Sequence, residues 1–222
     1  ANRMTVNGKT MAENIKDAQT WDREMIRPFN EPLKDNAGLL VLSGNLFDFA
    51  IMKTSVISEE FRRRFLSTPG AENVMEGNVV VFDSAEEYHA RINEPSLGID
   101  EKSILVVRNA GPVGWPGAAE VVNMQPPDAL LKAGITGLPV IGDGRQSGTS
   151  VSPAILHASP EAAIGGGLGW LRTGDVVRID INARSCNVQL SDAEIALRKA
   201  QMEPNILESQ TPWQEIYRAH VG

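Results

Sequence analysis

The chain has 222 residues, a formal net charge of −7 and an isoelectric point near 5.1, so no basic surface of the kind that binds nucleic acid is expected. Hydrophobic residues make up 42% and charged residues 22%, which is typical of a globular protein. No apolar run reaches the roughly 18 residues that cross a bilayer, and the first five residues lack the apolar core of a secretory signal. We therefore expect a cytoplasmic protein that binds neither nucleic acid nor membranes.

Cysteine and histidine are scarce. Cys186 is the only cysteine, which excludes an internal disulfide framework and suits a reducing compartment. Three scattered histidines, His89, His157 and His220, complete the set of soft ligands, too few for a thiolate or imidazole metal site. Any metal must be held by carboxylate oxygens, with help from another chain or domain. Cys186 alternates with apolar residues and His157 follows three of them, so we expect both side chains in the core.

The first 37 residues differ from the rest of the chain. Apolar residues are sparse there, and Pro28, Pro32 and Gly38 interrupt the segment. A segment with so little apolar surface seldom folds alone. We interpret residues 1–37, with a short helix at 11–18, as a connector arm from a domain that this sequence does not include, and residues 38–222 as the C-terminal domain.

From residue 38 onwards, strands and helices are interspersed. Serine or aspartate followed by acidic residues marks helix starts at Ser58, Ser84 and Ser191. Short apolar runs predict strands at 39–42, 50–53, 79–82, 104–107 and 135–141, and helices are predicted at 83–93, 127–133, 191–200 and 211–219. Alternation over 175–190 predicts a hairpin. Because a hairpin does not belong in a purely parallel sheet, the pattern indicates a mixed α/β domain.

Two polar, glycine-rich loops hold the candidate functional residues. The loop 142–150 follows an apolar run and contains Ser147, which is either a substrate-facing nucleophile or base, or a loop serine that bonds backbone. The loop 111–117 precedes Glu120, which is either a helix-dipole acid or an oxygen ligand for a cation such as Mg²⁺.

Two more charged residues, Asp143 and Arg145, flank the serine. They either bind a polar substrate or pair with each other. Neither the Gly-x-Ser-x-Gly elbow of esterases nor a Lys-Ser/Thr phosphate loop is present. These residues alone indicate one wall of an active site, without a complete catalytic set.

Several segments, in order, resemble the C-terminal domain of the dihydroxy-acid dehydratase / 6-phosphogluconate dehydratase family. The segments are Thr5 to Thr10, Ile26 to Pro28, Leu42 to Leu46, Gly111 to Glu120, Asp143 to Thr149 and His157 to Ala162. The resemblance covers nearly the whole chain. It implies a swivelling β/β/α domain with a β-barrel-like core flanked by helices, which closes over an iron–sulfur cluster held by the N-terminal domain.

The resemblance also implies an activity and a set of site residues. The family's enzymes are hydro-lyases that convert 2,3-dihydroxy acids to 2-keto acids with an iron–sulfur cluster and Mg²⁺. By this resemblance Glu120 is a Mg²⁺ ligand, Ser147 is the base that removes the C2 proton, and Thr149 helps to hold the substrate. We expect Arg145 and Gln146, as polar residues of the same loop, to bind substrate as well. The cluster ligands and most Mg²⁺ ligands belong to the N-terminal domain, so we expect this chain to be inactive alone and the full-length enzyme to be a homo-oligomer.

Departures from the family pattern narrow the substrate. Gln146 stands where enzymes of the amino-acid pathway usually carry phenylalanine, and Ser147-Gly148-Thr149 is similar to the sugar-acid branch, the arabinonate and xylonate dehydratases. These residues favour a sugar acid that becomes a 2-keto-3-deoxy acid. The alternatives are a branched-chain dihydroxy-acid dehydratase, a swivelling subunit that binds a partner without catalysing, and a non-catalytic ligand-binding domain.

Overall fold

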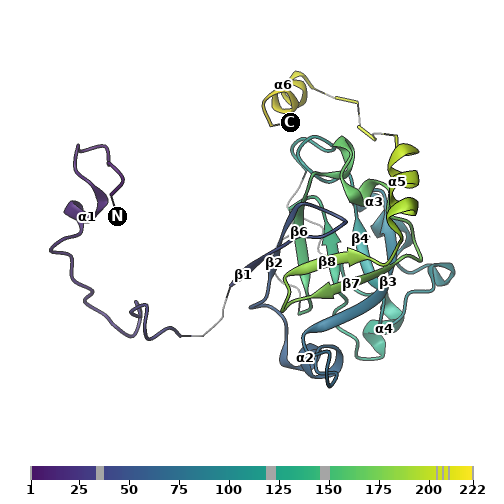
Figure 1. The fold of residues 1–222 in the computed structure, drawn as a ribbon, viewed down its shortest axis with the longest axis horizontal. Helices are drawn as coiled ribbons and strands as arrows, with labels where there is room; N and C mark the ends of the chain where they lie inside the picture. Colours follow the sequence, from purple (N-terminus) through teal and green to yellow (C-terminus); the bar gives the residue numbers. More distant parts are fainter. Residues whose placement is uncertain are drawn as a thin grey trace. The chain divides into compact units, whose positions relative to one another are not determined.

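The computed structural model describes residues 2–33, 38–118, 124–145, 151–203, 205–206, 208–209 and 211–221. The chain divides into two compact units, residues 1–37 and residues 38–222 (Figure 1). That the first unit connects to a further domain stays a prediction.

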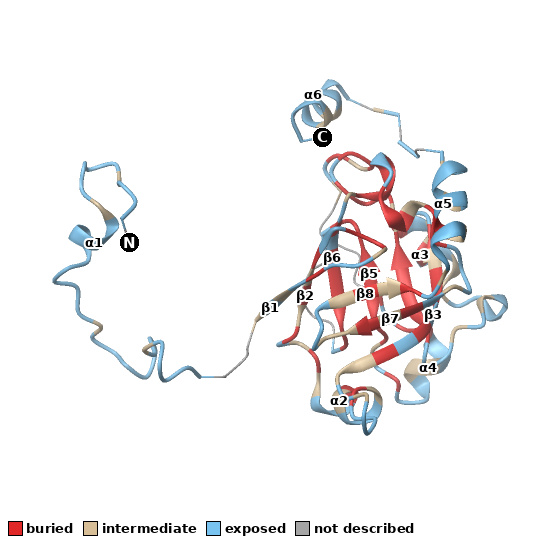
Figure 2. Cartoon of the chain, viewed as in Figure 1, coloured by how far each residue is buried: buried red, intermediate tan, exposed pale blue. Residues whose placement is uncertain are grey.

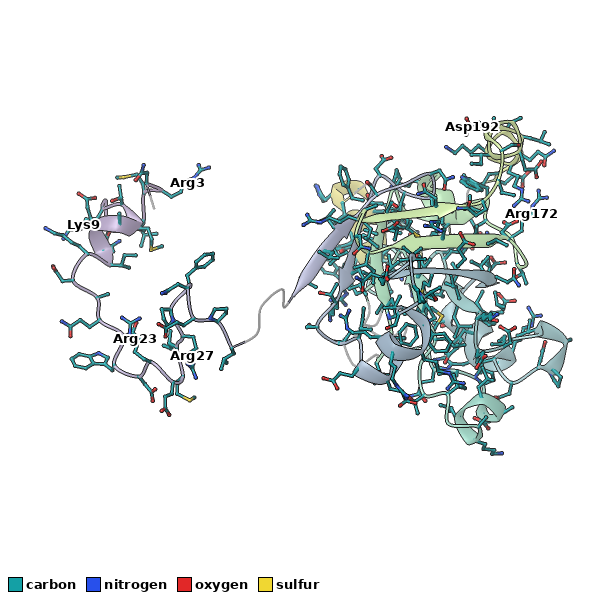
Figure 3. All side chains as sticks on the ribbon, turned by 60° about the horizontal axis from the view of Figure 1, so that its bottom comes forward. Arg3, Lys9, Arg23, Arg27, Arg172 and Asp192 are labelled. Atoms are coloured by element: carbon teal, nitrogen blue, oxygen red, sulfur yellow. The ribbon has the colours of Figure 1, made fainter. Side chains whose placement is uncertain are left out.

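No described residue of the first unit is buried. Its helix α1 (Met11–Asn14) has a capping box, in which Thr10 and Glu13 bond each other's backbone N–H groups. The helix ends four residues before the expected end at residue 18, because a short helix without a buried face gains no stability from packing. Large apolar side chains lie fully in solvent, with Trp21 92% and Phe29 103% exposed. Figure 3 shows the side chains of this unit standing out from the backbone, among them Arg3, Lys9, Arg23 and Arg27.

The second unit is built on one eight-stranded sheet in the order β1-β2-β6-β5-β4-β3-β7-β8. The strands are β1 (Leu39–Leu42), β2 (Phe49–Lys53), β3 (Val74–Phe82), β4 (Ile104–Val107), β5 (Val140–Gly142), β6 (Ala154–Ser159), β7 (Val176–Asp180) and β8 (Ser185–Val188). Strands β3, β4, β5 and β6 are parallel to their neighbours in this group, and the outer pairs are antiparallel. The sheet is therefore mixed, as the hairpin predicted.

The two edges of the sheet meet and nearly close a barrel. Just after β1, Ser43 forms a parallel bridge with Ser185 at the start of β8. The Ser43 N–H donates to Arg184 O at 3.1 Å, and the Cys186 N–H donates to Ser43 O at 3.0 Å. The Asn45 side chain adds two bonds to the backbone of Val188, at 2.8 and 2.9 Å. Closure satisfies backbone groups that would otherwise be left exposed on two edge strands.

Alternate residues of the parallel strands face two different cores. In β4, Ile104 and Val106 point into the barrel, while Leu105 and Val107 point outward to a second cluster. That outer cluster is covered by helix α3 (Ala85–Arg91), whose Tyr88 is buried in it. Figure 2 shows these strands as buried along most of their length. Burial on both faces explains the continuous apolar runs in the sequence.

The remaining helices lie outside the barrel. They are α2 (Glu59–Phe65), α4 (Asp128–Lys132), α5 (Asp192–Ala200) and α6 (Pro212–Val221), together with three 3₁₀ turns at Pro95–Leu97, Ala162–Ile164 and Gly167–Gly169. The predicted N-caps are confirmed, since Ser58, Ser84 and Ser191 each accept a backbone N–H three residues on. None of the helices in the described ranges is long and apolar enough to cross a membrane. The expected mixed α/β, barrel-like core flanked by helices is confirmed.

Two strand boundaries differ from the prediction. Strand β5 begins at Val140 rather than at residue 135, because Pro139 has no N–H to donate and only its carbonyl joins the ladder, accepting from Leu105 N at 2.9 Å. Strand β3 begins at Val74 rather than at residue 79, because its first half pairs with β7. Tertiary pairing set the start of β3, and a proline set the start of β5.

Candidate active site

The loops that carry the candidate residues leave the same edge of the sheet. Strands β3 to β6 run parallel, so their carboxyl ends lie together. The segments that follow β4, β5 and β6 begin at Arg108, Asp143 and Pro160. In open parallel sheets, ligands bind outside the carboxyl ends of the strands. We refer to these three following segments together as the carboxyl-end rim.

Asp143 ties the three segments of the rim to one another. Its side chain is buried, and its carboxylate accepts from Asn109 N at 3.0 Å, Ala110 N at 3.0 Å and Ala162 N at 2.9 Å. Burial raises the pKa of this carboxyl above its ordinary value, and the bonds from the three N–H groups oppose that rise. The described residues show no ion pair between Asp143 and Arg145, so Asp143 is a structural brace rather than a partner for that arginine.

Glu161, just after β6, braces the Gly-Pro-rich loop that follows β4. Its carboxylate accepts from Val113 N and from Gly114 N, both at 2.9 Å, and only 7% of the residue is exposed. Burial raises the pKa of this carboxyl, and the nearby charge of Asp143 adds to the rise. A Cβ at Gly111 would lie 2.3 Å from a Glu161 oxygen, so the loop packs this closely only with glycine there.

Arg108 anchors the start of the same loop. One guanidinium nitrogen donates to Leu168 O, Gly169 O and Leu171 O at 3.0, 2.8 and 3.0 Å, and Nε pairs with Asp83 at 2.5 Å. The guanidinium of Arg108 therefore stabilises the structure of the rim and does not serve as a ligand-binding group.

A cavity of about 440 Å³ opens at the rim. Its size is within the range of small-molecule sites. The wall combines two loops, strand β6 and helix α6, through Ala110, Pro112, Trp115, Pro116, Gly117, Ala118, Asp143, Gly144, Arg145, His157, Trp213, Gln214 and Tyr217. Aromatic surface, one guanidinium and one imidazole thus face a common space, which suits a small polar anion.

A second cavity, of about 460 Å³, lies beside helix α5. Its wall includes Asp48, Lys199 and the glycines Gly165, Gly166 and Gly167. No residue of the loops after β4 and β5 belongs to that wall. The first cavity is therefore the better candidate for the site that the sequence motifs indicate.

Of the site residues expected from the sequence, Arg145 lies in the described part of the chain. Its side chain is exposed, lines the cavity, and donates from Nη2 to Ala118 O at 3.2 Å. The other four, Glu120, Gln146, Ser147 and Thr149, lie outside the described residues.

The expectation that His157 belongs to the core is wrong. His157 is exposed and lines the cavity, and its φ of 54° departs from the extended geometry in which Ala154, Ile155 and Leu156 are buried. Partial desolvation of the ring, with the positive charges of Arg145 and Lys53, lowers the pKa of His157, so the imidazole is neutral at pH 7. The sequence signal for a functional His157 is the family-like segment His157 to Ala162, whereas the three preceding apolar residues favour packing.

Helix α6 is the other part of the site that sequence reasoning missed. Trp213 and Tyr217 line the cavity and stay 78% and 45% exposed. They lie about 100 residues from Trp115 in the chain, and their pattern is that of an ordinary amphipathic helix. Only the return of the chain to the rim places them there.

No cluster of three or more metal-ligating side chains occurs among the residues that the structure describes. Cys186 is buried as predicted, and burial raises the pKa of its thiol to about 12. The described side chains therefore do not fit an iron–sulfur cluster or a complete Mg²⁺ site.

With this geometry established, comparison with known proteins decides the family. Residues 24–222 match the family model described as dihydroxy-acid/6-phosphogluconate dehydratase C-terminal. The chain belongs to this dehydratase family.

Curated relatives of this dehydratase domain carry names from both branches of the family. The chain is 63% identical to the D-xylonate dehydratase of Caulobacter vibrioides over 99% of its own length and 37% of that protein. It is 37% identical to the L-arabinonate dehydratase of Rhizobium leguminosarum bv. trifolii, over 98% of this chain and 36% of the relative. It is 38% identical to a dihydroxy-acid dehydratase of Agathobacter rectalis, over 98% of this chain and 37% of the relative. The chain thus spans a little over one third of the length of the relatives it matches.

Proposed function

We propose that the chain is the C-terminal domain of a hydro-lyase that converts a 2,3-dihydroxy sugar acid to a 2-keto-3-deoxy acid. The observation that carries the proposal is the cavity at the rim, where the family's loop segments after β4 and β5 meet around Arg145 and His157. A guanidinium bonds a carboxylate with two parallel N–H groups, so Arg145 is suited to the acid group of the substrate. A neutral imidazole both donates and accepts, which suits a sugar hydroxyl.

The remaining roles fall on residues outside the described ranges. In our proposal Ser147 accepts the C2 proton, Gln146 and Thr149 bond the hydroxyls of the substrate, and Glu120 provides an oxygen ligand for Mg²⁺. The hydrogen bond between Arg145 and Ala118 joins the loops after β4 and β5, and in the sequence Glu120 and Ser147 follow these two residues at a distance of two positions.

The metal chemistry is assigned outside this chain. Because the described side chains form no metal cluster, we propose that the iron–sulfur cluster and all Mg²⁺ ligands other than Glu120 belong to the N-terminal domain. The chain alone is then inactive. We also propose, from the family, that the full-length enzyme is a cytoplasmic homo-oligomer.

A five-carbon sugar acid is the substrate we favour. The identity to the D-xylonate dehydratase, 63%, exceeds the 38% identity to the dihydroxy-acid dehydratase of A. rectalis. The cavity also has polar groups on its wall, which a branched-chain acid with an apolar tail does not use. The alternative is a branched-chain dihydroxy acid.

The test uses the full-length protein and follows 2-keto acid formation from D-xylonate, L-arabinonate and a branched-chain 2,3-dihydroxy acid. We expect the two sugar acids to react at least about tenfold faster, by kcat/KM, than the branched-chain acid. Ser147→Ala is expected to lower kcat by about 10³-fold, since it removes the proton acceptor. Ser67→Ala, at an exposed serine after helix α2, is the matched control and leaves kcat unchanged.

A higher kcat/KM for the branched-chain acid would show that this acid, and not a sugar acid, is the substrate. Full activity of Ser147→Ala would refute the proposed role of Ser147 as the base. Turnover by residues 1–222 alone, supplied with iron, sulfide and Mg²⁺, would contradict the division of labour between the domains. An inactive full-length protein would favour a partner-binding or ligand-binding role.

A further inference from the structure

Arg218 of helix α6 forms hydrogen bonds with the loop that follows β4. No described residue of α6 is buried, and Trp213, Ile216 and Tyr217 are between 45% and 78% exposed. Arg218 is half-buried, and its Nε donates to Val113 O at 2.8 Å, with a longer bond from Nη2 to Gly114 O at 3.4 Å. A helix with little apolar burial depends on such directional contacts for its position.

Arg218 and Glu161 bind the same peptide unit from opposite sides. In the peptide unit between Val113 and Gly114, the N–H donates to Glu161 and the C=O accepts from Arg218. In a trans peptide these two groups point in opposite directions. The loop after β4 is therefore held between a carboxylate of the barrel and a guanidinium of the last helix.

The two charged residues also support each other. The guanidinium of Arg218 lowers the pKa of Glu161 and so opposes the rise that burial and Asp143 cause. An ionised Glu161 accepts both N–H groups of the loop without a competing proton. The Arg218 Nη1 is in turn fixed by Ser209 Oγ at 2.6 Å, so the guanidinium has a defined orientation.

Both elements that Arg218 joins are walls of the same cavity. The loop contributes Pro112, Trp115 and Pro116, and helix α6 contributes Trp213 and Tyr217. We propose that Arg218 is a positioning residue that fixes helix α6 against the loop 111–118 and thereby sets the shape of the cavity in which the sugar acid binds. We call the contact of Arg218 with Val113 and Gly114 the clamp. The clamp rests on the described hydrogen bonds, and the identity of the ligand rests on the proposed function.

The clamp is tested in the full-length protein by hydrogen–deuterium exchange together with steady-state kinetics. Arg218→Met keeps the length of the side chain and removes its donors. We expect the amides of Val113 and Gly114 to exchange about tenfold faster in this variant. We expect KM for D-xylonate to rise about tenfold with kcat within about threefold of the parent, because substrate binding is weakened more than the chemical step.

Two further variants separate the clamp from general stability. Arg218→Lys keeps a charge and a donor but loses the planar fork, so both effects should be about half recovered on a logarithmic scale. Ile216→Ala, on the same helix and outside the cavity wall, is the matched control and should change neither quantity.

The outcomes are distinct. Unchanged exchange at Val113 and Gly114 in Arg218→Met would refute the clamp, even if the melting temperature falls. Faster exchange with unchanged KM would refute the link between the clamp and the cavity. If the full-length protein dehydrates no sugar acid, the proposed function fails, while the exchange measurement still decides whether Arg218 holds the loop.

Discussion

The apolar interior of the barrel and the two carboxylates that brace the rim at its carboxyl end are both buried, but they are held in place by different chemical groups. In the interior, Ile155, Ile179 and Cys186 are 0% exposed and pack against other apolar side chains. At the rim, Asp143 and Glu161 are 2% and 7% exposed and bind backbone N–H groups of neighbouring loops. Apolar packing stabilises without fixing direction, whereas hydrogen bonds fix orientation. The interior therefore supplies stability, and the rim supplies the geometry of the site.

The largest expected effect comes from removing the Asp143 carboxylate from the rim. Asp143→Ala leaves three buried N–H donors without their acceptor, and we expect the free energy of unfolding to fall by about 3–5 kcal/mol. Because the freed loops line the cavity, we also expect weaker binding of the sugar acid. Urea unfolding and a substrate titration measure the two effects.

The interior counterpart is Ile179→Val, which removes one methylene from the barrel and should cost about 1 kcal/mol while leaving substrate binding unchanged. If Ile179→Val weakens binding as much as Asp143→Ala does, the division between interior and rim is wrong.

A smaller effect concerns the reactivity of the interior. Burial raises the pKa of Cys186 to about 12, so at pH 8 only about 10⁻⁴ of this thiol is ionised. We expect iodoacetamide at pH 8 to leave Cys186 unmodified in the folded protein and to alkylate it rapidly in 8 M urea, about the concentration that unfolds most domains. Mass spectrometry of the peptide containing Cys186 reports the result. Alkylation at equal rates in both states would show that the interior is open to solvent.

The smallest effect is a titration at the rim. The pKa of His157 is lowered below its ordinary value of 6.5, since the folded state desolvates the ring and places Arg145 and Lys53 nearby. Between that lowered pKa and 6.5 the unfolded chain binds more protons, so the contribution of His157 to stability is present above pH 6.5 and is lost as the pH falls. NMR titration of the His157 ring protons should give a midpoint below 6.5. Arg145→Met should move this midpoint upward, and a midpoint above 6.5 in the parent protein would contradict the arrangement.

Local sequence patterns were sufficient for most of the barrel. The alternation in β7 and β8 and the apolar run of β4 are periodicities over a few residues. The caps at Ser58 and Ser191 are hydrogen bonds to residues three positions on. Such short-range rules do not fix the ends of strands. The start of β3 depended on pairing with β7, which belongs to the assembled sheet, whereas the start of β5 follows from Pro139, which the run 135–141 already contains.

The sequence by itself determined the fold class and the family motifs and made Arg145 a candidate substrate-binding residue, because these follow from residue types and their order along the chain. Only the tertiary structure decided that His157 faces the cavity, that Asp143 and Glu161 brace loops, and that Arg218 joins the last helix to the rim. The physical reason is that these roles are contacts between segments 19 to 105 residues apart, which local periodicity does not encode.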